Sequence, residues 1–481
     1  MTAIEKPFIH ALRTPLCNYI YDVNTNAFVD VDESTYQYLR EAEQRGGALP
    51  DGADEHIEQN LKTLRAQGYL SSKRPQEIRH SQSELLEYHL NENIAQIELQ
   101  VTQQCNFRCA YCNYCASDFE SQRDHSAKRM SVETALSAVD FFAKRCSNQE
   151  DPTIGFYGGE PLLEFPLIKR VTEYAEKKLY AKNLKFTVTT NASLLTPEIA
   201  RFMEEHDFML TISLDGTPET HDRSRRFASN GKGSFEVIRR NLENLKQQCP
   251  DLEYSFNTVV DPRYPCDSLH ELFSEDGFFG GARIRSTLID DQFSIKKTVP
   301  GEVFLQQDSR HMFKTYLTFQ GVYERKRASH VACQDLSAMF QRFKIDMKPS
   351  VSLPEAAAPS GPCIPGQMRL FVSADGILYP CERVSETSPA MKIGNLKEGF
   401  DLGKVDRLLN IAQDTAEDCK NCWVFRHCKL CGGPSDNCGE LSADLRRSQC
   451  ESVREQVEHS FRDYLWTREF GIPEDTLIKG V

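Results

Sequence analysis

The sequence predicts an α/β protein with an incomplete barrel of six β–α units at its centre. A small winged-helix-like module precedes the barrel, and a cysteine-rich region follows it. Three observations predict this arrangement. Apolar strand-like runs alternate with amphipathic helical segments from about residue 93 to residue 290. Polar motifs rich in Cys, Gly, Asn and Asp follow several of those runs, and eight of the 17 cysteines lie from Cys363 to Cys450.

The composition is that of a large soluble protein. The 481 residues suffice for about three domains, and 40% hydrophobic with 26% charged residues is ordinary for globular chains. A net charge of −13 argues against nucleic-acid binding by phosphate neutralisation. The sequence contains no run of 18 apolar residues, so it predicts no transmembrane helix. The N-terminus does not resemble a secretory signal. We therefore expect a cytoplasmic protein without a nucleic-acid or membrane partner, whose bunched cysteines bind metal rather than form disulfides.

Residues 1–92 are predicted to form a separate module. The segment 18–31 has the pattern of two strands around a polar turn, and Asp32 is placed to cap a following helix. Gly68 is placed just past the C-terminal end of a second amphipathic helix, a position where glycine commonly ends a helix. The polar stretch 71–84 is interpreted as a linker.

The central region, residues 93–310, is predicted to contain the barrel. Six units favour an incomplete barrel over a closed eight-stranded one. Repeated β–α units imply a parallel sheet with functional groups at the carboxyl ends of its strands. Residues 311–360 are expected to bridge to the cysteine-rich domain, 361–481. The predicted strands are 95–101, 153–157, 185–190, 208–213, 254–260 and 283–289.

Three cysteines follow the first predicted strand with the spacing C-x3-C-x2-C: Cys105, Cys109 and Cys112. Three thiolates on one loop can hold three irons of a 4Fe–4S cluster and leave the fourth iron open to a small molecule. The alternative is a closed zinc site, to which Cys115 would supply a fourth ligand, or a set of buried thiols.

This motif, with the aromatic Tyr111 before its last cysteine, resembles that of the radical S-adenosylmethionine (SAM) superfamily. Gly158, Gly159 and Glu160 follow the second strand and resemble the family segment that binds the SAM amino group. Glycines allow a close backbone approach, and a carboxylate pairs with an ammonium. The resemblance further implies SAM contacts at strand ends, whose alternative is turn and cap chemistry. These residues are Asn191, Ser213 and Asp215. Arg225 is expected to pair with the SAM carboxylate, with Arg223 and Arg226 as nearby alternatives.

The C-terminal cysteines resemble the SPASM extension of radical SAM enzymes that modify peptides. That resemblance implies two auxiliary 4Fe–4S clusters, and so three clusters in all. One cluster is assigned Cys419, Cys422, Cys428 and Cys450, and the other Cys363, Cys381 and Cys431. The spacing before Cys431 is x2 where the family usually has x3, and Cys438 is extra. The first set, Cys363, Cys381 and Cys431, therefore stays open between Cys438, Cys333 and no further ligand, whereas Cys419, Cys422, Cys428 and Cys450 form the second set. Zinc ribbons are the alternative interpretation of the CxxC pairs.

The N-terminal module resembles the recognition element of enzymes that mature ribosomally made peptides (RiPPs), which captures a leader peptide by strand addition. The whole resemblance implies peptide modification by a 5′-deoxyadenosyl radical, with a flavodoxin or ferredoxin as electron donor. Thioether cross-linking is the expected chemistry. The alternatives are carbon–carbon or carbon–oxygen cross-linking, anaerobic sulfatase maturation, and a non-catalytic iron–sulfur carrier or zinc scaffold. The sequence singles out no general base, peptide or oligomeric state.

Overall fold

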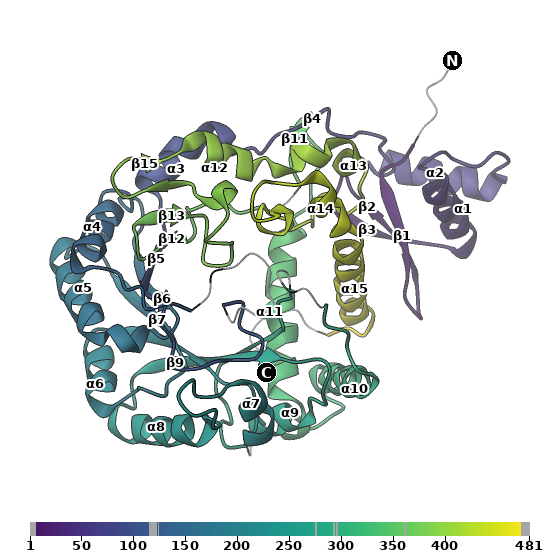
Figure 1. Ribbon diagram of the computed structural model, residues 1–481. Helices are drawn as coiled ribbons and strands as arrows, with labels where there is room; N and C mark the ends of the chain where they lie inside the picture. The colour runs from purple at the N-terminus through teal and green to yellow at the C-terminus, as the bar shows by residue number, and fades with distance from the viewer. Residues whose placement is uncertain are drawn as a thin grey trace.

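The computed structural model describes residues 6–114, 123, 125–274, 277–291, 294, 297–359 and 362–472. A curved sheet surrounds the centre of the molecule, with helices on its outer side, and the N-terminal module lies against the C-terminal region (Figure 1). No helix among the described residues is long and apolar enough to cross a membrane.

The N-terminal module is a three-stranded antiparallel sheet covered by two helices. Its strands are β1 (Ile9–Arg13), β2 (Asn18–Asp22) and β3 (Ala27–Val31), in the order β1-β2-β3, and its helices are α1 (Glu33–Gln44) and α2 (Glu55–Ala66). The cap is confirmed, because the Asp32 side chain accepts from the backbone N–H of Thr35 at 3.0 Å. Gly68 has a φ of 93°, as its predicted place past the helix requires. Strand β1 is the element that the sequence interpretation missed.

The barrel has the six parallel strands that the sequence predicts. They are β5 (Gln96–Thr102), β6 (Thr153–Gly158), β7 (Lys185–Thr190), β8 (Phe208–Ser213), β9 (Glu253–Val260) and β10 (Ile284–Leu288). The connecting helices are α4 (Val132–Ala143), α5 (Phe165–Lys178), α6 (Pro197–Glu205), α7 (Pro218–Ser224), α8 (Phe235–Gln248) and α9 (Asp267–Leu272). Strands β5 and β10 do not pair with each other, so the barrel is incomplete.

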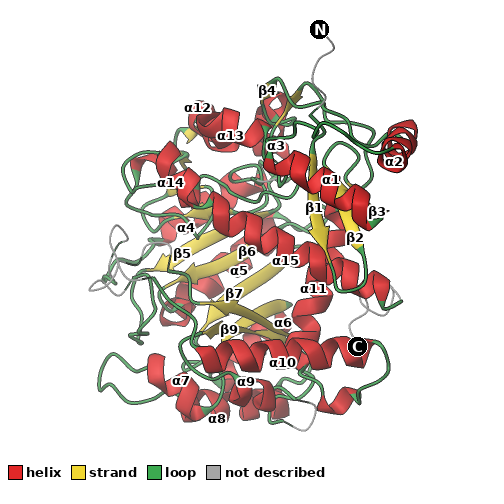
Figure 2. Cartoon of the chain, turned by 90° about the vertical axis from the view of Figure 1, so that its right-hand side faces the viewer, coloured by secondary structure: helices red, strands yellow, loops and turns green. Residues whose placement is uncertain are grey.

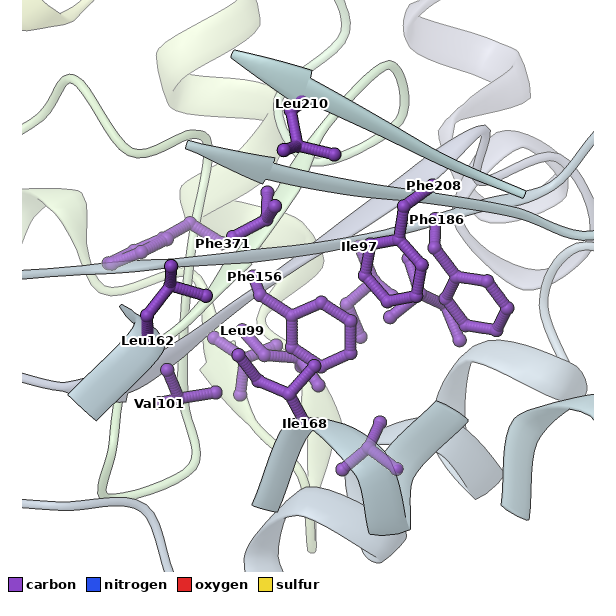
Figure 3. Packing of buried hydrophobic residues seen from close by; sticks show 14 of the residues in the cluster. Ile97, Leu99, Val101, Phe156, Leu162, Ile168, Phe186, Phe208, Leu210 and Phe371 are labelled. Carbon is purple, nitrogen blue, oxygen red and sulfur yellow. The ribbon is translucent and has the colours of Figure 1, made fainter. Parts of the chain in front are cut away.

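The core lies between the sheet and its outer helices. Ile97, Leu99 and Val101 of β5 pack there with Phe156 of β6 and Ile168 of α5 (Figure 3). Because side chains alternate along a strand, the even-numbered residues of β5 point to the other face, into the barrel. That face carries polar groups, which leaves the inside of the barrel suited to a polar ligand.

The cysteine-rich region extends the barrel sheet, which the sequence did not predict. Strand β12 (Leu370–Val372) pairs in parallel with β5. Strands β13 (Ile377–Tyr379), β14 (Gly394–Asn395) and β15 (Gly399–Phe400) follow as antiparallel neighbours and complete a ten-stranded sheet. The loops around Cys363 and Cys381 are thereby attached to the same sheet as the barrel.

The remaining helices connect the three parts. They are α10 (Glu302–Phe319), α11 (His330–Asp346), α12 (Leu402–Leu409), α13 (Ala416–Lys420), α14 (Ala443–Ser448) and α15 (Cys450–Glu469). Helix α15 lies beside the strands of the N-terminal module (Figure 2). Phe461 of α15 packs on Tyr21 of β2 with ring centroids 4.7 Å apart, and on Phe343 of α11 at 5.7 Å.

The segment interpreted as a linker is packed rather than free. Strand β4 (Glu77–Ile78) pairs in parallel with β11 (Ala356–Ala357), and Ile78 is buried. Helix α3 (Leu86–Glu92) then inserts two leucines into the barrel core. The polar composition of 71–84 hid this packing, because its single large apolar residue, Ile78, supplies most of the contact.

Candidate functional site

The loops after β5 and β6 touch through their backbones. Gly159 N–H donates to Thr102 O, and Glu160 N–H donates to Gln104 O, both at 2.9 Å. A Cβ on Gly158 would lie 2.1 Å from Thr102 O, and one on Gly159 would lie 2.2 Å from Gln104 O. Gly158 also has a φ of 139°. Only glycines allow this approach, which brings the cysteine loop against the following acidic residue.

The cysteine loop is also held on its other side. Arg108 N–H donates to Arg226 O at 2.9 Å, and Ala110 N–H donates to Ser224 O at 3.1 Å. The Phe107 ring packs edge-on against Phe227 at 4.9 Å. The loop between Cys105 and Cys112 is therefore fixed by the segment that follows β8.

Two thiols of this loop, those of Cys105 and Cys109, are partly buried. Burial raises the pKa of Cys105 and of Cys109 to about 12. Cys112 Sγ lies 3.7 Å from His125 Nε2. A bound metal would have to displace the thiol protons, since the thiolate is the ligand form of cysteine.

Glu160 is a buried carboxylate at the end of β6. Its Oε1 accepts from Thr190 Oγ1 at 2.7 Å and from Leu162 N–H at 3.1 Å, and its Oε2 accepts from Asn191 N–H at 2.7 Å. Burial raises its pKa, and these hydrogen bonds act in the opposite direction. A carboxylate has about four acceptor positions, so one remains for a ligand.

Tyr111, Asp215 and Arg225 form a buried polar triad. Arg225 Nε donates to Asp215 Oδ2 at 2.7 Å, and Tyr111 OH donates to the same oxygen. The other oxygen, Oδ1, accepts from Val259 N–H at 3.0 Å. Burial raises the pKa of Tyr111 far above its ordinary value, so this hydroxyl keeps its proton. Asp215 thus positions the aromatic residue of the cysteine motif and balances the arginine charge.

A cavity with about 670 Å³ of empty volume, open solvent included, collects most of the predicted residues. Three predicted ligands and seven predicted SAM contacts line it: Cys105, Cys109, Cys112, Tyr111, Gly158, Gly159, Glu160, Asn191, Ser213 and Arg225. Asp215 lies behind Tyr111 and lines a neighbouring cavity with about 440 Å³ of empty volume. The structure thus brings together on one wall the residues that the sequence placed at separate strand ends.

The sequence interpretation missed several lining residues: Phe107, Tyr114, His125, Tyr157, Thr189 and Thr190. Tyr157 and Thr189 were open to prediction, because they occupy the strand positions that alternate with the buried Phe156 and Val188. His125 has no such signal, since only the folding of the loop brings it to Cys112.

Within each of the two sets that the SPASM resemblance implies, cysteines affect one another's pKa. In the first set, burial raises the pKa of Cys381 to about 12, with Glu382 and then the charges of Cys431 and Cys363 acting in the same direction. In the second, burial raises the pKa of Cys428 to about 11, with added effects of Cys419 and Cys422. Cys450 likewise feels the charge of Cys419.

The two open candidates for the first set lie in different surroundings. Cys438 has a φ of 70°, and its N–H donates to Asp436 Oδ1 at 2.9 Å. Cys333 is buried on α11, with its Sγ 3.9 Å from Thr315 Oγ1 of α10. Cys115 lies outside the described residues. Within the described ranges, no three His, Cys, Asp or Glu side chains are grouped as ligands of a single metal ion.

The comparison with protein families identifies the central domain. Residues 99–274 match the sequence model of the radical SAM superfamily. The chain carries a radical SAM domain. The domain runs from β5 to just past α9, so it contains the cysteine loop, Glu160, the triad and the cavity that they line.

Curated relatives of the radical SAM domain include sulfatase-maturating enzymes and a cyclopropyl synthase. The cysteine-type anaerobic sulfatase-maturating enzyme of Clostridium perfringens is 25% identical over 74% of this chain and 93% of its own. The radical SAM cyclopropyl synthase TigE of Paramaledivibacter caminithermalis is 24% identical over 52% of this chain and 53% of its own. A Clostridium novyi sulfatase-maturating enzyme is 32% identical over 36% of this chain. The chain spans about half the length of the latter two relatives, 53% and 46%.

A solved structure shares the fold. The anaerobic sulfatase-maturating enzyme anSMEcpe, in a structure with bound AdoMet, superposes with a TM-score of 0.55 and 19% identity. The superposition covers 76% of this chain and 99% of that one. The radical SAM fold and its parallel sheet are therefore common to both proteins.

The site of this chain fits the two groups that the family implies. Three cysteine thiols line a cavity beside a glycine pair too crowded for any Cβ. A buried carboxylate with a free acceptor position and a buried arginine line the same cavity. Thiols suit an iron–sulfur cluster, and the two opposite charges suit the ammonium and carboxylate of an amino-acid ligand.

Proposed function

We propose that the chain is a radical SAM enzyme that cross-links a ribosomally made precursor peptide, forming thioethers between cysteine sulfur and carbon. The observation that supports this best is the cavity where Cys105, Cys109 and Cys112 face Glu160 and Arg225. A 4Fe–4S cluster with bound SAM supplies, when present, the 5′-deoxyadenosyl radical that removes a hydrogen atom from a substrate carbon.

The chain's own residues would hold SAM by its charged ends. Glu160 would accept from the ammonium through its remaining acceptor position, and that cation would offset the cost of burying the carboxylate. Arg225 uses Nε for Asp215, and its terminal nitrogens make no hydrogen bond to the described residues, so they are free for a carboxylate. Asn191 and Ser213 line the cavity between them and would contact the ribose.

The N-terminal module would bind the leader of the peptide. In the described part of the chain β3 pairs only with β2, so its outer edge offers unpaired backbone groups. An extended peptide can add to such an edge as a further strand. Because the module packs on α15 and α11, a peptide held there would begin close to the C-terminal cysteines.

Residues 361–481 would hold two auxiliary 4Fe–4S clusters, which gives three clusters in all. Cys419, Cys422, Cys428 and Cys450 supply four thiols to one of them. Cys363, Cys381 and Cys431 supply three to the other, which leaves one position for Cys438 or a non-protein ligand. Clusters at these places would take up the electron that thioether formation releases. A flavodoxin or ferredoxin would reduce the SAM-binding cluster at Cys105, Cys109 and Cys112.

The test is an anaerobic reaction with SAM and dithionite. The peptide substrate is the product of a short open reading frame beside the gene. We expect release of 5′-deoxyadenosine, and a peptide lighter by two hydrogen atoms for each linkage, because each thioether removes one hydrogen from carbon and one from sulfur. Intact SAM under these conditions would contradict an enzymatic role. An unchanged peptide mass together with 5′-deoxyadenosine would indicate epimerisation instead.

Sulfatase maturation is the second candidate, and the 93% coverage of the Clostridium perfringens enzyme favours it. A synthetic peptide with a sulfatase cysteine motif distinguishes the two, because its oxidation would support maturation of a folded protein. The cyclopropyl synthase among the relatives favours carbon–carbon bond formation as a variant of the same chemistry. Cross-links in a peptide that lacks cysteine would support that variant.

A further inference from the structure

Arg446 of α14 is a buried cation with no anion beside it in the folded polypeptide. It is 1% exposed and is among the largest fully buried side chains. Its Nε donates to Thr415 Oγ1, and a terminal nitrogen donates to Leu430 O, both at 3.2 Å. Neither partner is charged, and no carboxylate of the described residues forms an ion pair with Arg446. A buried charge is costly unless a partner balances it, so an anion is expected nearby.

Three cysteines of the second set, Cys419, Cys428 and Cys450, lie near this arginine. Burial raises the pKa of Cys428 and of Cys450, and the Arg446 charge acts on both in the opposite direction. Cys450 Sγ lies 3.7 Å from Arg446 O, one helical turn away. The thiolates of these cysteines are therefore the nearest groups able to balance the arginine.

Thr415 connects the arginine to a third cysteine. Its Oγ1 accepts from Arg446 Nε and lies 3.3 Å from Cys419 Sγ. Because the hydroxyl oxygen is used as the acceptor, its own proton is free to donate to the Cys419 sulfur. The arginine thus acts on the cysteines both through its charge and through a hydrogen bond relayed by Thr415.

Two other charges lie near the set, and both are more exposed. The Arg454 charge lowers the pKa of Cys422 and Cys450, whereas that of Asp418 raises the pKa of Cys450, each against the larger effect of burial. Arg454 is half-buried, and Asp418 already pairs with Arg447 at 2.8 Å. On Cys450 the Arg454 charge acts more strongly than that of Arg446, whereas on Cys428 Arg446 is the arginine that acts. Solvent screens the more exposed Arg454 and Asp418, and it screens the fully buried Arg446 least.

We propose that Arg446 is the counter-cation of an iron–sulfur cluster held by Cys419, Cys422, Cys428 and Cys450, and that it makes this cluster easier to reduce. The inference rests on the proposed function, which assigns a cluster to these cysteines. A cluster with four thiolates carries net negative charge, and one more electron adds to it. A fixed positive charge and a hydrogen bond to a ligand sulfur both stabilise the reduced form. Arg446 is a positioning residue in this scheme, because it touches ligands and not substrate.

The test is the reduction potential of this cluster in the full-length protein, loaded with iron and sulfide without air. Electron paramagnetic resonance follows a dithionite titration, and the signal that Cys428→Ala removes identifies the cluster. Arg446→Gln keeps a polar side chain and loses the charge, whereas Arg446→Lys keeps the charge. We expect Arg446→Gln to lower the reduction equilibrium constant about tenfold or more, which is about 59 mV for one electron. Arg446→Lys should stay within about threefold of wild type by the same relation.

Arg447→Gln is the matched control on the same helix. Arg447 is exposed and already paired with Asp418 and Asp444, so its loss should leave the potential unchanged. Equal shifts in the Gln and Lys variants of Arg446, or none in the Gln variant, would overturn the inference and leave the proposed clusters in place. A wild-type protein without any signal that depends on Cys428 would overturn both.

Thr415→Val provides a second route if Arg446→Gln does not yield loaded protein. This variant keeps the arginine and removes the hydroxyl that reaches Cys419. We expect a smaller shift in the same direction, to a more negative potential. An unchanged potential in Thr415→Val would contradict the relay, and with it the assigned effect on the cluster.

Discussion

The three motif cysteines of the radical SAM domain lie on one short loop, whereas the C-terminal cysteines come from separate segments that only the fold brings together. Each region also holds a buried arginine. In the domain, Arg225 is balanced by Asp215 of the protein itself. In the C-terminal region Arg446 has no carboxylate partner among the described residues. The charge of Arg225 is therefore balanced before the first site binds a ligand, whereas the charge of Arg446 depends on thiolates for its balance.

The difference suggests two ways of building a cluster site. The loop of the domain leaves a cavity open at the strand ends, which suits a cluster that must bind a small molecule. The C-terminal set that contains Arg446 offers four thiols, which suits a closed cluster that carries electrons. If that is so, mutations in the two regions should have separable effects.

The largest expected effect is the loss of SAM cleavage in Cys105→Ala. Removal of one of three thiols from the open site should reduce 5′-deoxyadenosine to background. Cys428→Ala should instead retain cleavage within about tenfold and abolish the modified peptide. Chromatography of 5′-deoxyadenosine and mass spectrometry of the peptide measure the two outcomes. Equal loss of cleavage in two folded, iron-loaded variants would break the comparison.

The next largest effect concerns the balanced arginine. Asp215→Asn leaves Arg225 buried without its carboxylate, so we expect about 3–5 kcal/mol less free energy of unfolding. The exposed pair of Lys185 and Asp207 provides the control, because Asp207→Asn should cost about 0–1 kcal/mol. Denaturant unfolding monitored by fluorescence measures both. A small effect of Asp215→Asn would mean that the triad does not require its ion pair.

Gly159→Ala tests the contact between the two loops of the domain. The added Cβ would meet Gln104 O, so we expect a loss of about 2–3 kcal/mol and weaker SAM binding. Gly403→Ala, on α12 of the cysteine-rich region, is the control. A Cβ at Gly403 would lie 3.4 Å from its nearest neighbouring atom, Asp401 Oδ1. There alanine should leave stability unchanged or raise it by up to about 1 kcal/mol. Thermal unfolding compares the two.

An effect confined to high pH is expected where the two regions meet inside the barrel. Glu98 of β5 is buried, and burial, with the neighbouring Glu382 acting in the same direction, raises its pKa from 4.5 to about 8. The folded protein therefore keeps a proton that the unfolded chain releases. The contribution of protonated Glu98 to the free energy of unfolding is fully present below pH 4.5 and is lost as the pH rises through 8.

Glu98→Gln should remove this dependence on pH. We expect the variant to be close to wild type at pH 5 and to exceed it by about 4 kcal/mol at pH 9. Glu173→Gln on the exposed side of α5 is the control and should show no such difference. Unfolding curves at both pH values measure it, and parallel pH profiles of wild type and Glu98→Gln would show that Glu98 is ionised in the folded state.

The sequence predicted the local features of the domain because those features are set by neighbouring residues. Apolar strand-like runs located all six barrel strands. The two strand-end glycines and the cysteine spacing placed the site at the correct edge of the sheet. The sequence interpretation missed β1 and found a linker where β4 and α3 pack, because those elements are stabilised by distant partners.

By itself the sequence determined the six β–α units, the cysteine loop and the residues at the strand ends, since periodicity, caps and turns act over a few residues. Only the tertiary structure decided that β12 extends the barrel sheet at β5 and that the N-terminal sheet is covered on both faces. It alone placed Arg446 beside Cys428 and Cys450 and linked it through Thr415 to Cys419. These features come from contacts between residues far apart in the chain, and the burial and charge balance that create them exist only once the chain has folded.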